Sequence, residues 1–168
     1  MRVAILGPLV VEHDGRPVAI GGQRLRALLI RLALEPGRWM SPATLLDALW
    51  EGEDSPGMPA DPLNALQSLV SRLRRLLPDP QLLESSASGY RLAIAPEDVD
   101  ATRLEALASR GRAALAGGDP DAAVTALQEA SGLWHGAPLP DVDGAAFAQP
   151  YVTHLEQPTR CRKRSRRN

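Results

Sequence analysis

The stretch 62–77 constrains the fold most, because it carries the clearest helical pattern in the chain. Asp61 and Pro62 supply a helix cap and a first-turn proline at its start. With one residue every ~100° around the helix axis, most of its large apolar side chains fall into a single stripe. That stripe consists of Leu63, Leu66, Leu69, Val70, Leu73 and Leu77. We therefore predict a helix that buries one face and exposes the other.

The outward face of this helix carries no carboxylate after Asp61. Its side chains are amides, hydroxyls and guanidinium groups, namely Asn64, Gln67, Ser68, Ser71, Arg72, Arg74 and Arg75. Such groups hydrogen-bond base edges and phosphates in the major groove of DNA. The alternative is an ordinary amphipathic helix, since surface helices often carry arginine. Taken alone, the helix fits this ordinary interpretation slightly better, although a solvated face usually mixes charges of both signs and this one does not.

Short strands and two further helices precede this helix. The apolar run 3–6 and the segments that flank Asp14-Gly15 predict a small antiparallel sheet, because Asp-Gly is a strong hairpin turn. Apolar residues at helical spacing then predict helices over 23–35 and 42–50. Sheet, helices and the stretch 62–77 follow one another without long gaps.

A second hairpin is expected after the third helix, where 82–84 and 90–94 bracket the small residues 85–89. Strands, three helices and a closing hairpin make an α+β winged-helix pattern, which we assign to residues 1–96. In this pattern the third helix enters the major groove and the hairpin, or wing, lies along the adjacent backbone. Arg91 is the natural wing contact, and Tyr90 is expected to pack beneath the wing.

Residues 97–157 predict an all-helical second module. Helices over 102–116 and 120–134 form a tetratricopeptide-like hairpin, and another helix begins near Tyr151. The inward positions are Leu104, Leu107, Ala108, Leu115, Ala123, Val124, Leu127 and Ala130, with Phe147, Tyr151 and Leu155 in the last helix. A single hairpin cannot bury its apolar face alone. We therefore expect this module to expose apolar surface and to self-associate or be marginally stable.

The net charge of -1 conceals three regions of different charge. Residues 1–92 are neutral, residues 93–159 carry a net charge of -7, and residues 160–168 carry +6. The overall field therefore does not attract nucleic acid, and any affinity for it must come from a local basic face.

Several classes of enzyme and site are excluded by composition. Cys161 is the only cysteine and Lys163 the only lysine, which excludes an intrachain disulfide, a cysteine zinc cage and a phosphate-binding lysine loop upstream. The histidines, His13, His135 and His154, lie far apart in the sequence. We expect no enzyme activity, cofactor or metal. No segment reaches the ~18 apolar residues of a membrane span, so we expect a cytoplasmic protein without membrane contact.

The basic tail 158–168 has no apolar periodicity and is expected to be disordered. Three interpretations stay open: a basic arm that binds the DNA backbone, a solvated tail without a role, and out-of-frame coding at the end of a truncated gene. The abrupt onset and the arginine-rich composition favour the third. The nucleotide sequence around residue 157 would decide among them.

Six short motifs occur in order along the chain: QRLRALL at 23–29, DALW at 47–50, LVSRLRR at 69–75, GYRL at 89–92, VDA at 99–101 and LWHGAPL at 133–139. Together they resemble the SARP family (Streptomyces antibiotic regulatory proteins) over about residues 1–157. The resemblance implies an OmpR-type winged helix followed by a bacterial transcriptional activator domain. That domain normally continues with further helices, and we expect no receiver domain before the winged helix.

Members of this family activate transcription, typically of secondary-metabolite clusters, by binding direct repeats near a promoter and recruiting RNA polymerase. The resemblance therefore implies double-stranded DNA and RNA polymerase as partners; a homodimer is left open. We expect base selectivity from Asn64, Gln67, Ser68, Ser71 and Arg75. Arg24, Arg26 and Arg72 are more plausible as phosphate or structural groups. The alternative is a truncated helical protein-interaction module that acts as an inactive or dominant-negative regulator.

Overall fold

The computed structural model describes residues 1–51 and 57–155. It opens with an antiparallel sheet of strands β1 (Arg2–Ala4), β2 (Val10–His13) and β3 (Arg16–Pro17), in that order. Asp14 and Gly15 form the turn between β2 and β3, with φ angles of 50° and 73°. A two-residue hairpin turn of type I′ needs positive φ at both positions. The predicted hairpin is confirmed.

Three helices follow the sheet, α1 (Gln23–Ala33), α2 (Pro42–Trp50) and α3 (Pro62–Leu76). The start of α2 is fixed by Ser41, whose hydroxyl accepts a hydrogen bond from the Thr44 N–H at 3.2 Å. The three helices bury their leucines against one another, with Leu28, Leu29, Leu45, Leu66 and Leu73 fully buried. The predicted helices are therefore present, each within a few residues of its expected bounds.

The apolar stripe of α3 is confirmed except at its first member. Leu66, Leu69, Val70, Leu73 and Leu77 are buried, whereas Leu63 is 55% exposed. The prediction that Leu63 belongs to the core is wrong because the core begins one turn later, at Leu66.

The wing consists of a short 3-10 turn η1 (Pro80–Leu82) and strands β4 (Leu83–Ser86) and β5 (Gly89–Leu92). Its strands run closer to the tip than predicted, since only Ala87 and Ser88 form the turn. Met40 pairs with Tyr90 in an isolated antiparallel bridge alongside β5. Gly89 has a φ of 121°, and a Cβ there would lie 1.9 Å from the Met40 carbonyl oxygen, so the close pairing requires glycine.

The second module begins with η2 (Pro96–Asp98) and continues into the helical hairpin α4 (Asp100–Ala116) and α5 (Pro120–Gly132). Ala123, Ala126 and Ala130 of α5 are buried, and the first two lie beside Gly111 of α4. Small side chains at a crossing let two helix backbones approach closely. The hairpin is confirmed, and the buried side chains of α5 are alanines.

Three predicted inward positions of this hairpin are wrong. Leu115, Val124 and Leu127 are 59%, 52% and 43% exposed. Alanines are the buried residues of α5, so its larger side chains are left partly in solvent, and Leu127 lies at the edge of the contact, beside Gly111 of α4. The expectation that the module exposes apolar surface is thus confirmed for the described residues, and that of self-association remains a prediction.

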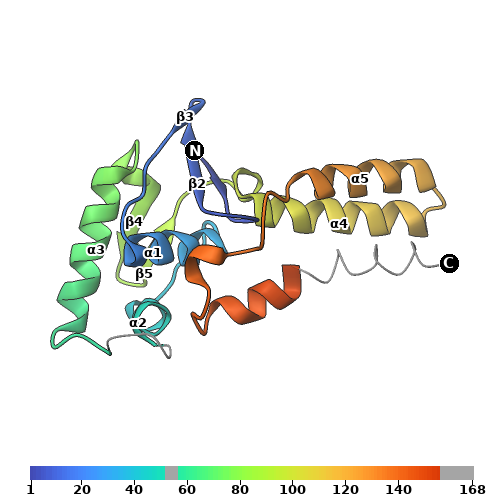
Figure 1. Cartoon of the computed structure of the whole chain (residues 1–168). Helices are drawn as coiled ribbons and strands as arrows, with labels where there is room; N and C mark the ends of the chain where they lie inside the picture. The colour runs from blue at the N-terminus through green and yellow to red at the C-terminus, as the bar shows by residue number, and fades with distance from the viewer. Residues whose placement is uncertain (52–56, 156–168) are drawn as a thin grey trace.

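After α5 the chain returns to the winged helix through η3 (Pro140–Val142) and a helix that covers 148–155 (Figure 1). The predicted last helix is present, with Leu155 buried. The N–H groups of His135 and Leu139 donate to the carbonyls of Leu6 and Ile5 at 3.0 and 3.1 Å. Leu139, Val142, Ala148 and Leu155 belong to the same apolar core as the leucines of α1 and α3. The two modules therefore pack as one body.

Asp100, at the start of α4, fastens the two modules. Its carboxylate accepts hydrogen bonds from the Ile5 N–H at 2.8 Å and the Leu6 N–H at 2.9 Å. Burial raises the pKa of this carboxyl above its ordinary value, and the backbone N–H donors offset only part of that effect. These hydrogen bonds hold Ile5 and Leu6, the residues that follow β1, to the second module.

In the described part of the chain, no helix is long and apolar enough to cross a membrane. The expectations for the tail 158–168 fall outside the described residues.

Candidate nucleic-acid interface

The outward face of α3 exposes the side chains that the sequence singled out. Asn64, Gln67, Ser68, Ser71, Arg72 and Arg75 are exposed. A shallow surface groove is lined by Gln67, Ser68, Ser71, Arg72 and Arg75. The structure thus brings five of the predicted residues together on one face, with Asn64 one turn before them.

The start of α3 is fixed by its own sequence. The Asp61 carboxylate accepts a hydrogen bond from the Asn64 N–H at 3.1 Å, and Pro62 occupies the first turn. Arg74 and Arg75 lie in the last turn, where cations stabilise the carbonyl end of the helix dipole. Between Pro62 and Leu76 the helix contains no acidic residue, so its exposed face is positive.

Arg74 differs from the other predicted residues of α3. It is half-buried, and its Nε donates a hydrogen bond to the Leu83 carbonyl at 2.8 Å. Leu83 begins β4, so this contact ties α3 to the wing. The observed role of Arg74 is therefore to orient the two elements relative to each other.

Arg91, the predicted wing contact, is engaged within the wing. Its Nε lies 2.6 Å from a carboxylate oxygen of Glu84 on the neighbouring strand. The guanidinium carbon lies 4.6 Å from the ring centroid of Trp39. The charge of Arg91 is thus partly balanced by Glu84. Tyr90 packs against the core beneath the wing, as expected.

The two arginines of α1 in the predicted set have partners away from α3. The Arg24 guanidinium carbon lies 5.3 Å from the ring centroid of Trp50 in α2. Arg26 pairs with the Asp141 carboxylate at 2.6 Å, and the other oxygen of that carboxylate accepts from the Leu9 N–H. Two roles were considered for Arg24 and Arg26, a phosphate contact and a structural role. These contacts support the structural role.

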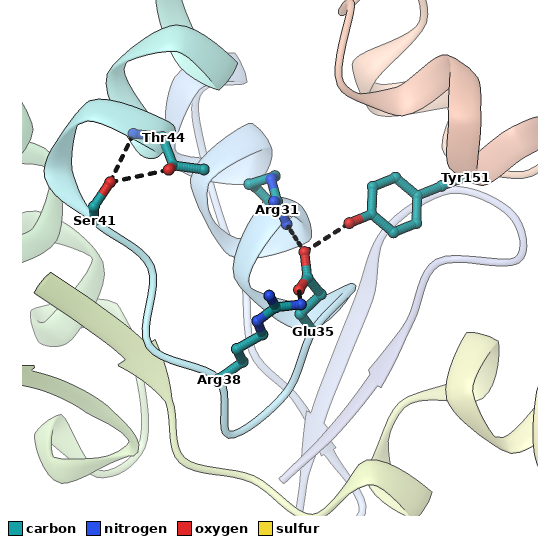
Figure 2. Close-up of polar contacts among 6 residues, drawn as sticks. All are labelled: Arg31, Glu35, Arg38, Ser41, Thr44 and Tyr151. Carbon is teal, nitrogen blue, oxygen red and sulfur yellow. Dashed lines mark hydrogen bonds and ion pairs between the residues drawn. The ribbon is translucent and has the colours of Figure 1, made fainter. Parts of the chain in front are cut away.

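Sequence reasoning missed a polar cluster between the modules. Glu35 accepts hydrogen bonds from Arg31 at 2.9 Å and from the Tyr151 hydroxyl at 2.7 Å, and it also pairs with Arg38 (Figure 2). Tyr151 reaches Glu35 from the helix at 148–155, as Figure 2 shows. The spacing of Arg31 and Glu35 could have revealed their pair. Nothing in the sequence pointed to Tyr151 as its third member.

The contacts in this cluster shift the pKa values of Glu35 and Tyr151. Burial alone would raise the pKa of Glu35, but the hydrogen bonds from Tyr151 and Arg31 and the positive charges nearby outweigh it and leave the pKa below its ordinary value. Burial and the hydrogen bond to Glu35 raise the pKa of Tyr151. The cluster is therefore held as a carboxylate with a neutral phenol.

Among residues 1–51 and 57–155, no group of three or more His, Cys, Asp or Glu side chains is placed to hold a metal ion.

Comparison with known protein families divides the chain into two parts. Residues 15–92 match the family model described as "Transcriptional regulatory protein, C terminal", and residues 99–162 match that of the bacterial transcriptional activator domain. Relatives similar to this chain, among them AfsR and RedD, are regulators of the SARP type. The chain belongs to the SARP family.

Two SARP relatives from Streptomyces coelicolor illustrate the similarity. The regulatory protein AfsR is 38% identical over 92% of this chain, and the transcriptional regulator RedD is 37% identical over 93% of it. The chain spans 15% of AfsR and 47% of RedD.

A solved structure extends the similarity to the fold. The structure of Mycobacterium tuberculosis EmbR in complex with a low affinity phosphopeptide superposes with a TM-score of 0.81 at 34% sequence identity. The match covers 92% of this chain and 41% of the EmbR chain. The α+β architecture of this SARP chain is therefore that of EmbR in the matched region.

Proposed function

We propose that this SARP chain is a sequence-specific DNA-binding transcriptional activator. In this proposal, α3 enters the major groove, and Asn64, Gln67, Ser68, Ser71 and Arg75 read base edges while Arg72 contacts phosphate. The observation that carries the proposal is the exposed, carboxylate-free face of α3, on which five of these residues line one groove. An exposed face of hydrogen-bond donors and positive charge is complementary to the major groove.

The intramolecular contacts refine the expected DNA-binding set. Arg74 uses its Nε to hold α3 to the wing, and Arg91 uses its Nε on Glu84 within the wing, so we propose structural roles for both. Arg24 and Arg26 are held by Trp50 and Asp141, and we assign them structural roles rather than contacts with DNA.

The details of the regulatory role are inferred from the resemblance to the SARP family. We propose that residues 1–96 form the DNA-binding domain and residues 97–157 an activator domain, and that the protein binds direct repeats and recruits RNA polymerase to a secondary-metabolite promoter. The name of RedD as a transcriptional regulator and the two matched domain families support transcription as the process.

The test begins with duplexes selected by the intact chain from a random DNA library. Enrichment of one sequence motif is expected, and Arg75→Ala should then weaken binding to it. The matched control is Arg112→Ala, an exposed arginine of α4 in the second module, which should bind as the unmodified chain does. The proposal is wrong if no motif is enriched.

A second candidate function rests on a different observation. Leu115, Val124 and Leu127 leave an apolar surface on the helical hairpin, which suits a protein-interaction module. This function predicts retention of a protein partner through the hairpin and no preference among DNA sequences. The selection experiment separates the two.

A further inference from the structure

Leu63 is the one large apolar side chain in the first turn of α3 that the core does not use. It is 55% exposed, whereas Leu66 in the next turn is 1% exposed. A single exposed leucine is common on protein surfaces and needs no function. Its position on the helix is what distinguishes it.

Leu63 begins a ridge that continues into the candidate interface. Residues four apart on a helix form a continuous row on its surface. The row that starts at Leu63 continues through Gln67, Ser71 and Arg75, and these three line the surface groove of α3. Leu63 is therefore the N-terminal member of the ridge that we assign to DNA.

The chemistry of the major groove indicates which group of DNA an apolar side chain at position 63 could contact. The N-terminal residues of a recognition helix are those that contact base edges. The apolar group that bases present there is the 5-methyl group of thymine, which aliphatic side chains contact. We infer that Leu63 contacts a thymine methyl and makes the protein prefer thymine at one position of each half-site. This inference rests on the proposed function.

The test removes the methyl group without altering any hydrogen bond. The intact chain first selects its binding motif from a random duplex library. Each thymine of the selected duplex is then replaced in turn by deoxyuridine, and binding is measured by fluorescence anisotropy. Replacement at one thymine should weaken binding about fourfold, the factor expected when one methyl group loses an apolar contact. Leu63→Ala should bind the thymine and deoxyuridine probes equally.

The control is Leu76→Ala, a 39% exposed leucine at the other end of α3, which should keep the preference for thymine. The inference is overturned if no deoxyuridine probe binds more weakly, if the selected motif lacks thymine, or if Leu63→Ala keeps the preference. Each of these results leaves the proposed function standing. Failure to enrich any motif removes the proposed function itself.

Discussion

The junction between the two modules and the outward face of α3 use charged residues in opposite ways. At the junction, Asp100 binds two backbone N–H groups, Arg26 pairs with Asp141, and Glu35 is paired as well. On α3, Arg72 and Arg75 are exposed and have no hydrogen-bond or ion-pair partner among the residues that the structure describes. Paired charges stabilise the protein's own structure, whereas unpaired charges on an exposed face remain free to bind a ligand.

This contrast separates stability from binding. Substitutions at the junction should lower the free energy of unfolding without changing DNA affinity per folded molecule. Substitutions on the outward face of α3 should lower DNA affinity with little change in the free energy of unfolding.

The largest effect is expected for Asp100→Ala. The substitution leaves the Ile5 and Leu6 N–H groups without their acceptor, and each buried unpaired donor costs about 1–3 kcal/mol. We expect a loss of roughly 2–4 kcal/mol in the free energy of unfolding, measured by urea denaturation. The exposed Glu97→Ala serves as control and should unfold as the unmodified chain does. Equal free energies of unfolding for the two variants would show that Asp100 does not stabilise the junction between the modules.

Arg75→Ala should show the second largest effect, and this effect is on DNA affinity. Loss of a bidentate arginine–base contact costs about 1–3 kcal/mol of discrimination. Gel shifts with the selected duplex should show that loss, with no more than the small drop in melting temperature expected when one cation leaves the carbonyl end of a helix. An unchanged affinity would exclude Arg75 from the residues that read bases.

Tyr151→Phe tests the cluster around Glu35 with one atom removed. We expect about 1 kcal/mol lower stability at neutral pH, since the hydrogen bond to the carboxylate is lost. Because that bond helps to lower the pKa of Glu35, its contribution is full above the ordinary pKa of a glutamate and is lost as pH falls through the lowered value. Urea denaturation at several pH values should show the difference between the two proteins closing in acid. A difference that stays constant with pH would contradict the role of the carboxylate.

Arg26→Ala should have the smallest effect. Its ion pair with Asp141 is partly exposed, and such pairs contribute about 0–1 kcal/mol. Thermal unfolding should detect this small loss, and DNA affinity should stay the same. Weaker DNA binding at unchanged stability would place Arg26 in the interface after all.

The sequence was sufficient for the elements but not for the contacts between them. The Asp14-Gly15 turn and the Ser41 cap carry their structural preference in the local sequence, so both were predictable. The exposure of Val124 and Leu127 was not, because periodicity does not show whether alanines or larger residues face the partner helix. The contact of Tyr151 with Glu35 spans 116 residues, and no local pattern encodes it.

The candidate interface was predictable to a similar degree. The absence of carboxylates on α3 identified the exposed face, since charge is visible in the sequence. Which arginines are engaged elsewhere was not visible, because Arg74 and Arg91 bind groups that the fold brings to them.

The salt dependence of DNA binding tests the central claim most directly, because each arginine–phosphate contact releases counterions. Dissociation constants for the selected duplex would be measured over a range of salt concentrations for the unmodified chain, Arg72→Ala and Arg26→Ala. We expect Arg72→Ala to reduce the slope of log Kd against log salt by about one and Arg26→Ala to leave it unchanged. A reduced slope for Arg26→Ala together with an unchanged slope for Arg72→Ala would contradict the assignment of DNA binding to α3.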